Sequence, residues 1–271
     1  MLSNLGIIFS SISLLASLFL IHLSFVELKV SGDKIPKKIY KFSLVQLIFS
    51  LLSFLILLIG YIFSDFSMIN VYENSHTTKP LFYKISGTWG NHEGSLLLWI
   101  NILVIFSFLF LILNKNKNKN FKIFTLIFQN LLISIFFIFL LTNSNPFSPV
   151  FPVPNEGLGL NPILQDPALA IHPPLLYVGF VGSSIYFSAA LAALISKVEA
   201  KSLAITLKPW ISISWFFQTI GILVGSIWAY YELGWGGYWF WDPVENVALM
   251  PWLAATAFMH SLFASSKSNV L

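Results

Sequence analysis

The chain has 271 residues, of which 56% are hydrophobic and only 10% are charged, with a formal net charge of +4. This composition excludes a soluble domain and indicates an all-α integral membrane protein surrounded by membrane lipid. The small positive charge gives no reason to expect a nucleic-acid partner. Because the sequence contains no cysteine, the chain itself can neither exchange disulfides nor offer a thiolate.

Seven apolar segments are each close to the roughly 20 residues that a helix needs to cross a bilayer. The first is too long and too unlike a cleavable signal to be a targeting peptide. We therefore predict a polytopic protein with about seven transmembrane helices. The predicted spans are residues 5–26, 44–63, 95–113, 121–142, 172–195, 210–231 and 248–265.

The lysines indicate how these spans are oriented. If the N-terminus lies on the outer side, the inner segments are 27–43, 114–120, 196–209 and the C-terminal tail, and 13 of the 15 lysines belong to them once Lys122 at a span boundary is included. This is the positive-inside pattern. It places the N-terminus, 8 of the 11 acidic residues and the motifs described next on the outer face.

The first motif, WGNHEGS, precedes the third span and includes Trp89, Asn91, His92 and Glu93. Its simplest interpretation is a helix N-cap with an acid that the helix dipole favours. The alternative is that these side chains contact a cofactor or a partner protein. The residues alone leave both interpretations open.

The second motif is AIHPPLL, at the start of the fifth span, where Pro167 suits the first turn of a helix. Pro173 and Pro174 remove two backbone donors, so we expect the helix to be kinked or locally opened there. An ionisable residue in a span is costly without a partner, which makes His172 a functional candidate. Haem iron is one such partner, because neutral imidazole is a common axial ligand. A histidine that is hydrogen-bonded inside the bundle is the alternative.

The third motif is an aromatic string between the last two spans, which we expect to form a platform for a large flat ligand such as a porphyrin. An interfacial aromatic belt is the alternative, but a belt requires neither the Gly-Gly pair nor the acids in this string. Asp242, Pro243 and Glu245 also match a capping box at a helix start. The expected platform residues are Trp235, Tyr238, Trp239, Trp241, Asp242 and Trp252.

The last span carries His260, eight residues after Trp252. Trp252, Thr256 and His260 are spaced by four, so on a helix they share a face and the imidazole can point back toward the platform. An axial ligand and a packed helix histidine are equally good interpretations from the residues alone.

These motifs carry a family resemblance. GWGGYWFWDPVEN resembles the tryptophan-rich WWD signature of the haem-handling proteins of cytochrome c maturation. WGNHEGSLLLW and LQDPALAIHPPLLYVG are similar to motifs of one branch, the CcmF-type haem lyases of system I, in the same order and spacing along nearly the whole chain. Tyr238 stands where the family usually has tryptophan, which implies weaker stacking.

The resemblance implies a subunit of a haem lyase, the enzyme that forms thioether bonds between haem and apocytochrome c. It implies that His172 ligates a haem b held in the membrane. It also implies that His260 ligates the iron of a transient haem on the Trp-rich platform. Trp89, Asn91, His92 and Glu93 become possible outer-face contacts. No residue is predicted to be a catalytic acid or base.

The resemblance also implies partners. Family members continue for several more spans that bring the second histidine of each pair, so we expect this chain to be the N-terminal part of a split protein, inactive alone and completed by a C-terminal chain. The other expected partners are a haem chaperone, apocytochrome c, and the proteins that reduce and present its thiols.

The lack of arginine and the abundance of Phe, Ile, Asn and Lys indicate an AT-rich, organellar genome. We therefore expect a mitochondrial inner membrane location with the platform facing the intermembrane space. The alternative is a bacterial plasma membrane with the platform facing the periplasm. The expected domains are a bundle at 1–231, an outer platform at 232–252, and a last helix with its inner tail at 253–271.

Two other functional classes fit the same residues. One is a membrane subunit for haem transport, or for haem or quinone electron transfer, that makes no covalent bond. The other is a structural assembly subunit without haem.

Overall fold

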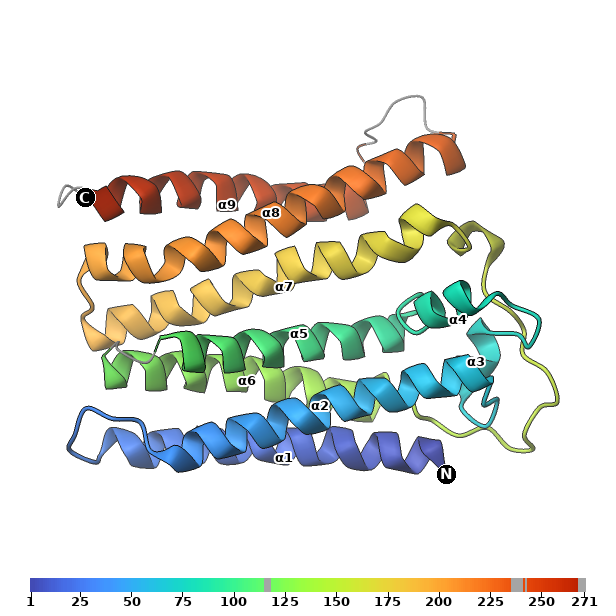
Figure 1. The fold of residues 1–271 in the computed structure, drawn as a ribbon, viewed down its shortest axis with the longest axis horizontal. Coiled ribbons are helices and arrows are strands. Elements are labelled where there is room, and N and C mark those ends of the chain that lie inside the picture. Colours follow the sequence, from blue (N-terminus) through green and yellow to red (C-terminus); the bar gives the residue numbers. More distant parts are fainter. Residues whose placement is uncertain (115–117, 235–240, 242, 268–271) are drawn as a thin grey trace.

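Seven long helices lie side by side in the computed structural model, which describes residues 1–114, 118–234, 241 and 243–267 (Figure 1). All seven are long and apolar enough to cross a membrane, which confirms the predicted number of spans. The described residues contain no strand, only an isolated bridge between Met68 and Pro149. The long helices are α1 (Leu2–Leu28), α2 (Lys37–Phe63), α5 (His92–Leu113), α6 (Lys119–Asn143), α7 (Pro167–Ser196), α8 (Ala200–Glu232) and α9 (Pro243–Lys267).

Most of these helices extend beyond the predicted spans. The clearest case is α8, which begins at Ala200, so residues 200–209, predicted as an inner loop, form its first turns and Pro209 lies inside the helix. The loop prediction was wrong here. Hydropathy detects only the part of a helix that lies in hydrocarbon, whereas backbone hydrogen bonding continues into the polar ends.

The two ends of the bundle differ (Figure 1). One end carries the N-terminus, the end of α8, and the short helices α3 (Ile69–Asn74), α4 (Leu81–Gly87) and η1 (Pro162–Leu164). The starts of α5 and α7 lie at this same end. The WGNHEGS motif and the AIHPPLL motif of residues 170–176, called the HPP motif below, therefore share it, as predicted. Which side of the membrane this end faces stays a prediction.

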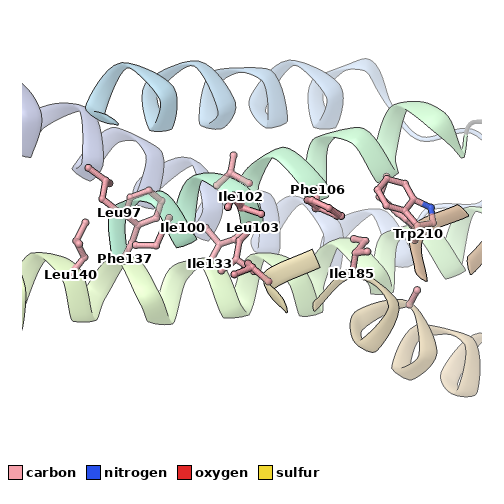
Figure 2. Packing of buried hydrophobic residues seen from close by; sticks show 14 of the residues in the cluster. Leu97, Ile100, Ile102, Leu103, Phe106, Ile133, Phe137, Leu140, Ile185 and Trp210 are labelled. Carbon is pink, nitrogen blue, oxygen red and sulfur yellow. The ribbon is translucent and has the colours of Figure 1, made fainter. Parts of the chain in front are cut away.

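Helix α5 lies at the centre of the bundle and contacts α2, α6 and α7. Its apolar side chains interdigitate with those of its neighbours in the core that Figure 2 shows. Helix α7 packs on α8, and α9 in turn packs mainly on α8. The labelled core residues are Leu97, Ile100, Ile102, Leu103 and Phe106 of α5, Ile133, Phe137 and Leu140 of α6, Ile185 of α7 and Trp210 of α8.

Polar side chains inside the bundle form hydrogen bonds between helices. Ser10 of α1 meets Ser53 of α2 with 2.6 Å between the hydroxyl oxygens, and Gln46 Nε2 donates to Asn130 Oδ1 of α6 at 2.9 Å. Such bonds are required because hydrocarbon offers no substitute partner. They also specify how neighbouring helices align along their axes, because in lipid the contacts between apolar side chains alone distinguish weakly between alternative alignments.

A buried ion pair joins α1 to α6 at the opposite end of the bundle. Lys119 Nζ lies 2.8 Å from Glu27 Oε1 and donates to the carbonyl oxygen of Val30 at 2.9 Å. Both side chains are more than nine-tenths buried.

Lys119→Met should therefore destabilise the protein by about 3–5 kcal/mol, because it leaves the Glu27 carboxylate buried and unpaired. Thermal unfolding in detergent measures the loss as a lowered Tm. Lys38→Met, at an exposed position of α2 on the same end, is the control and should leave the Tm unchanged. Equal melting of the two variants would contradict the assigned role of the pair.

Candidate functional site

The WGNHEGS motif is held by a hydrogen-bond network. Asn91 Oδ1 accepts from the backbone N–H of Gly94 at 2.8 Å, so Asn91 caps α5, which was the simpler of the two interpretations left open. Asn91 Nδ2 donates to the hydroxyl of Tyr61 in α2 at 2.8 Å. Asn70 Nδ2 of α3 donates to Asn91 Oδ1 at 2.8 Å and to Glu93 Oε2 at 3.1 Å. The motif is therefore fixed to two other helices at the end of the bundle.

A cavity of about 910 Å³ adjoins this motif, between α5, α6 and α7. Its volume is within the usual range of ligand pockets. The Trp99 ring forms part of the wall and lies 5.5 Å from the Tyr177 ring, centroid to centroid. The exposed His92 is at the polar end, with Nδ1 3.3 Å from the hydroxyl of Ser144. The lining includes Ser86, Trp89, Asn91, His92, Ser95, Trp99, Phe136, Pro173 and Tyr177.

His172 lies on the other side of α7, against α8. Its Nδ1 is 2.7 Å from the carbonyl oxygen of Gly221, and a Cβ added at Gly225 would lie 2.5 Å from its Cε1. The absent side chain of Gly225 thus makes room for the ring, whereas Gly221, one turn earlier, admits the α7 backbone at Leu176 and supplies the carbonyl acceptor. A carbonyl oxygen can only accept, so Nδ1 carries a proton, and in the neutral ring Nε2 keeps its lone pair. This is the state that an axial ligand of haem iron requires. The same bond would also satisfy a purely structural histidine.

Helix α7 begins at Pro167, as predicted, and Asp166 caps it by accepting from two backbone N–H groups. It continues without interruption through Pro173 and Pro174, so the helix is not locally opened there. The indole N–H of Trp89 donates to the carbonyl oxygen of Ala170 at 2.9 Å. The WGNHEGS and HPP motifs are therefore in direct contact.

Much of the expected platform, namely Trp235, Tyr238, Trp239 and Asp242, lies outside the described residues. Trp241 is exposed. Helix α9 begins at Pro243 with Glu245 in its first turn, as the capping pattern predicted.

Trp252 packs on α8. Its ring is stacked on Trp215 with the centroids 5.9 Å apart, and its indole N–H donates to the hydroxyl of Thr219 at 2.7 Å. Trp215 donates in turn to the hydroxyl of Thr256 at 2.7 Å. Trp252 and Thr256 therefore both face α8. The His260 side chain, in contrast, is not covered by any of the residues that the structure describes and is exposed.

These contacts also fix the depths of the two histidines. Trp252 lies beside Thr219 and Thr256 beside Trp215, so antiparallel α9 carries His260 further along, while His172 lies beside Gly221. With a rise of about 1.5 Å per residue, His260 lies roughly 15–20 Å further than His172 from the end of α8 at Glu232, measured along the helix axis. His172 is thus nearer the end of α8 from which the Trp-rich string continues.

Sequence reasoning missed Gly221 and Gly225 as residues that support the site. The signal was present as GILVG, two glycines four residues apart in a span, a pattern that lets helix backbones approach closely. Here Gly221 lets α8 approach the backbone of α7 at Leu176, and Gly225 leaves space for the His172 ring.

The loop before α7 is tied to the loop after α3 through Glu156. Its carboxylate accepts hydrogen bonds from the hydroxyl and backbone N–H of Thr77 and from the backbone N–H of Gly157, and His76 is nearby. These interactions, led by the Thr77 hydroxyl, lower the pKa of Glu156 to about 2.

A carboxyl whose pKa is lower in the folded state stabilises the fold above its unfolded pKa of about 4.5 and loses that contribution as pH falls toward 2. We therefore expect amide hydrogen exchange in residues 150–158 to speed up, relative to the intrinsic rates, below about pH 4.5. Thr77→Val should move this transition to higher pH. An unchanged transition would show that the Thr77 hydroxyl does not hold the loop.

Comparisons with known proteins agree with this polytopic helical architecture. The family model described as Cytochrome C assembly protein matches residues 89–271. The cytochrome c-type biogenesis protein CycK of Bradyrhizobium diazoefficiens is 49% identical over 229 residues, which are 84% of this chain and 35% of the relative. CcmF of Escherichia coli is 46% identical over 211 residues, 78% of this chain and 33% of the relative.

A solved structure described as Cytochrome c Heme Lyase CcmF superposes with a TM-score of 0.85 at 28% identity and covers 100% of this chain and 43% of that one. The fold and the motifs thus define a membrane protein of cytochrome c biogenesis. The chain belongs to the cytochrome c assembly protein family, and its relatives make it a CcmF-type maturation protein. It spans about a third of the length of the curated relatives named here, which are bacterial.

Proposed function

We propose that this chain is the haem-holding part of a cytochrome c haem lyase, which places haem for covalent attachment to apocytochrome c. The observation that carries the proposal is the hydrogen bond of His172 Nδ1 to Gly221, which leaves the lone pair of the neutral imidazole on Nε2, the atom that would bind iron. His172 lies at the end of the bundle from which the Trp-rich string continues. Family membership supports the same function.

The described residues fit a haem in part. His172 supplies an axial nitrogen in the tautomer that iron requires. The cavity near WGNHEGS is not the site of that haem, because the His172 ring does not line it. The haem supplies vinyl groups that react with thiols. The chain's own contribution is to hold and orient, because correct placement of two reactants provides much of a rate enhancement. The thiols belong to the substrate or another protein, since this chain has no cysteine.

We propose that His172 and His260 ligate two different haem irons. The family resemblance implied that His172 ligates the membrane haem b and that His260 ligates the platform haem. The depth of the two residues favours the exchanged assignment, with His172 serving the platform and His260 a haem b deeper in the membrane. An exposed histidine within a span is costly in lipid, so His260 requires a partner such as iron or another protein segment.

The second axial ligand of each iron would come from the region of the relatives that this chain does not match, on the same or a separate polypeptide. That region would also cover α9, whose span is mostly uncovered in the described part of the chain. A haem chaperone, apocytochrome c and thiol-reducing proteins complete the proposed partners.

The decisive experiment is a reconstitution of the assembled complex with haem and reduced apocytochrome c. A pyridine haemochrome spectrum measures haem uptake, and haem that remains on denatured cytochrome c measures thioether formation. A lyase gives both. Haem uptake without attachment would assign the chain to transport or electron transfer, and no uptake would assign it a structural role.

The proposed orientation can be tested with tags. A tag near residues 155–160 should be accessible from the intermembrane space or periplasm, whereas tags at 114–118 and 197–199 should be protected, because the lysine-rich end stays inside. Protease accessibility in intact mitoplasts or spheroplasts measures this. The reverse pattern would put the motifs on the wrong face for cytochrome c.

A further inference from the structure

The prolines of the HPP motif remove two backbone hydrogen bonds from α7, and a side chain from another motif replaces one of them. In a regular helix the N–H of residue 174 would donate to the carbonyl oxygen of residue 170, but Pro174 has no N–H. The indole N–H of Trp89 donates to that oxygen, on Ala170, at 2.9 Å. The bond joins residues 81 positions apart in the sequence.

His172 lies on the same turn, two residues after Ala170 and two before Pro174. At about 100° per residue it projects from the opposite side of the helix, where its Nδ1 meets Gly221. The turn is therefore tethered on both sides, by Trp89 through Ala170 and by Gly221 through the imidazole.

Little packing around Trp89 and Ala170 reinforces the hydrogen bond between them. Trp89 and Ala170 both border the 910 Å³ cavity and also a second cavity of about 280 Å³. With open space on two sides of this contact, the hydrogen bond has few neighbouring atoms to substitute for it. Trp89 is itself fixed, because its carbonyl oxygen accepts from the hydroxyl of Ser95 at 2.6 Å.

We propose that Trp89 is a positioning residue for His172. Its indole N–H replaces the helix bond lost at Pro174, holds the turn that carries the imidazole, and so sets the direction of Nε2. The link to haem rests on the proposed function of His172, whereas the tether itself does not. The WGNHEGS motif thereby acts on the haem ligand without touching the haem.

The first test is Trp89→Phe in the assembled complex, which keeps an aromatic ring and removes the N–H. We expect haem at the His172 site to dissociate about fivefold faster, as befits one lost hydrogen bond, and its reduction potential to shift. Trp99→Phe is the matched control, since Trp99 lines the same cavity and packs its ring against neighbouring aromatic rings. It should change neither readout.

The second test restores the missing donor. Pro174→Ala returns an N–H to the helix, so Trp89→Phe should have little effect on haem dissociation or potential in that background. Amide hydrogen exchange of residues 168–176 gives a readout that needs no haem, and it should speed up in Trp89→Phe and recover in the double variant.

The proposal is overturned if Trp89→Phe matches the wild type in exchange, or if its effects are the same with and without Pro174→Ala. His172→Ala separates the two hypotheses. Retention of all haem by that variant would refute the proposed function, while the exchange measurement would still decide the tether.

Discussion

Gly225→Ala will displace the His172 imidazole and remove the haem that it ligates. The new Cβ would lie 2.5 Å from Cε1 and 2.7 Å from Nδ1, well inside contact distance. The ring must rotate away, which breaks its bond to Gly221 and redirects Nε2. Alanine favours the helix by up to about 1 kcal/mol relative to glycine, so the protein should still fold.

Haem content of the purified complex, by pyridine haemochrome, should fall by one of the two proposed haems. Ile227→Ala, an exposed position two residues further along α8, is the control and should keep full content. Full haem content in Gly225→Ala would mean that the His172 ring does not hold iron in the observed position.

His172→Ala and His260→Ala will remove different haems. On the proposed assignment, His172→Ala abolishes cytochrome c formation but keeps the deeper haem b, because an alanine leaves the platform iron without its protein ligand from this chain. His260→Ala removes the stable haem b from the purified complex and leaves haem delivery to the platform intact.

Low-spin haem spectra of the two variants, measured beside a haem attachment assay, distinguish the assignments. The opposite pattern, with haem b lost only in His172→Ala, would restore the assignment that the family resemblance implied. If neither substitution changed the spectrum, neither histidine would be an iron ligand.

Local properties of the chain predicted much of the fold. Runs of apolar residues indicated all seven spans, and caps predicted the helix starts at Pro167 and Pro243 and the capping role of Asn91. These features depend on residues within one or two turns of each other, so the sequence contains them directly. Residues 200–209 were mistaken for a loop because helix and hydrocarbon boundaries do not coincide.

The candidate site was predicted only in part. The sequence alone pointed to His172 and to the WGNHEGS motif as important. It could not show that Trp89 contacts Ala170 or that the His172 ring lies on Gly221 and Gly225.

The sequence by itself therefore determined the class, the spans, the motifs and the family resemblance. Only the tertiary structure decided which motifs touch, which glycines seat the imidazole, and which histidine is deeper. The reason is physical, because these contacts join residues 49 and 81 positions apart and depend on how α7, α8 and α9 are aligned along their axes. That alignment is set by packing and hydrogen bonds between whole helices and not by local pattern.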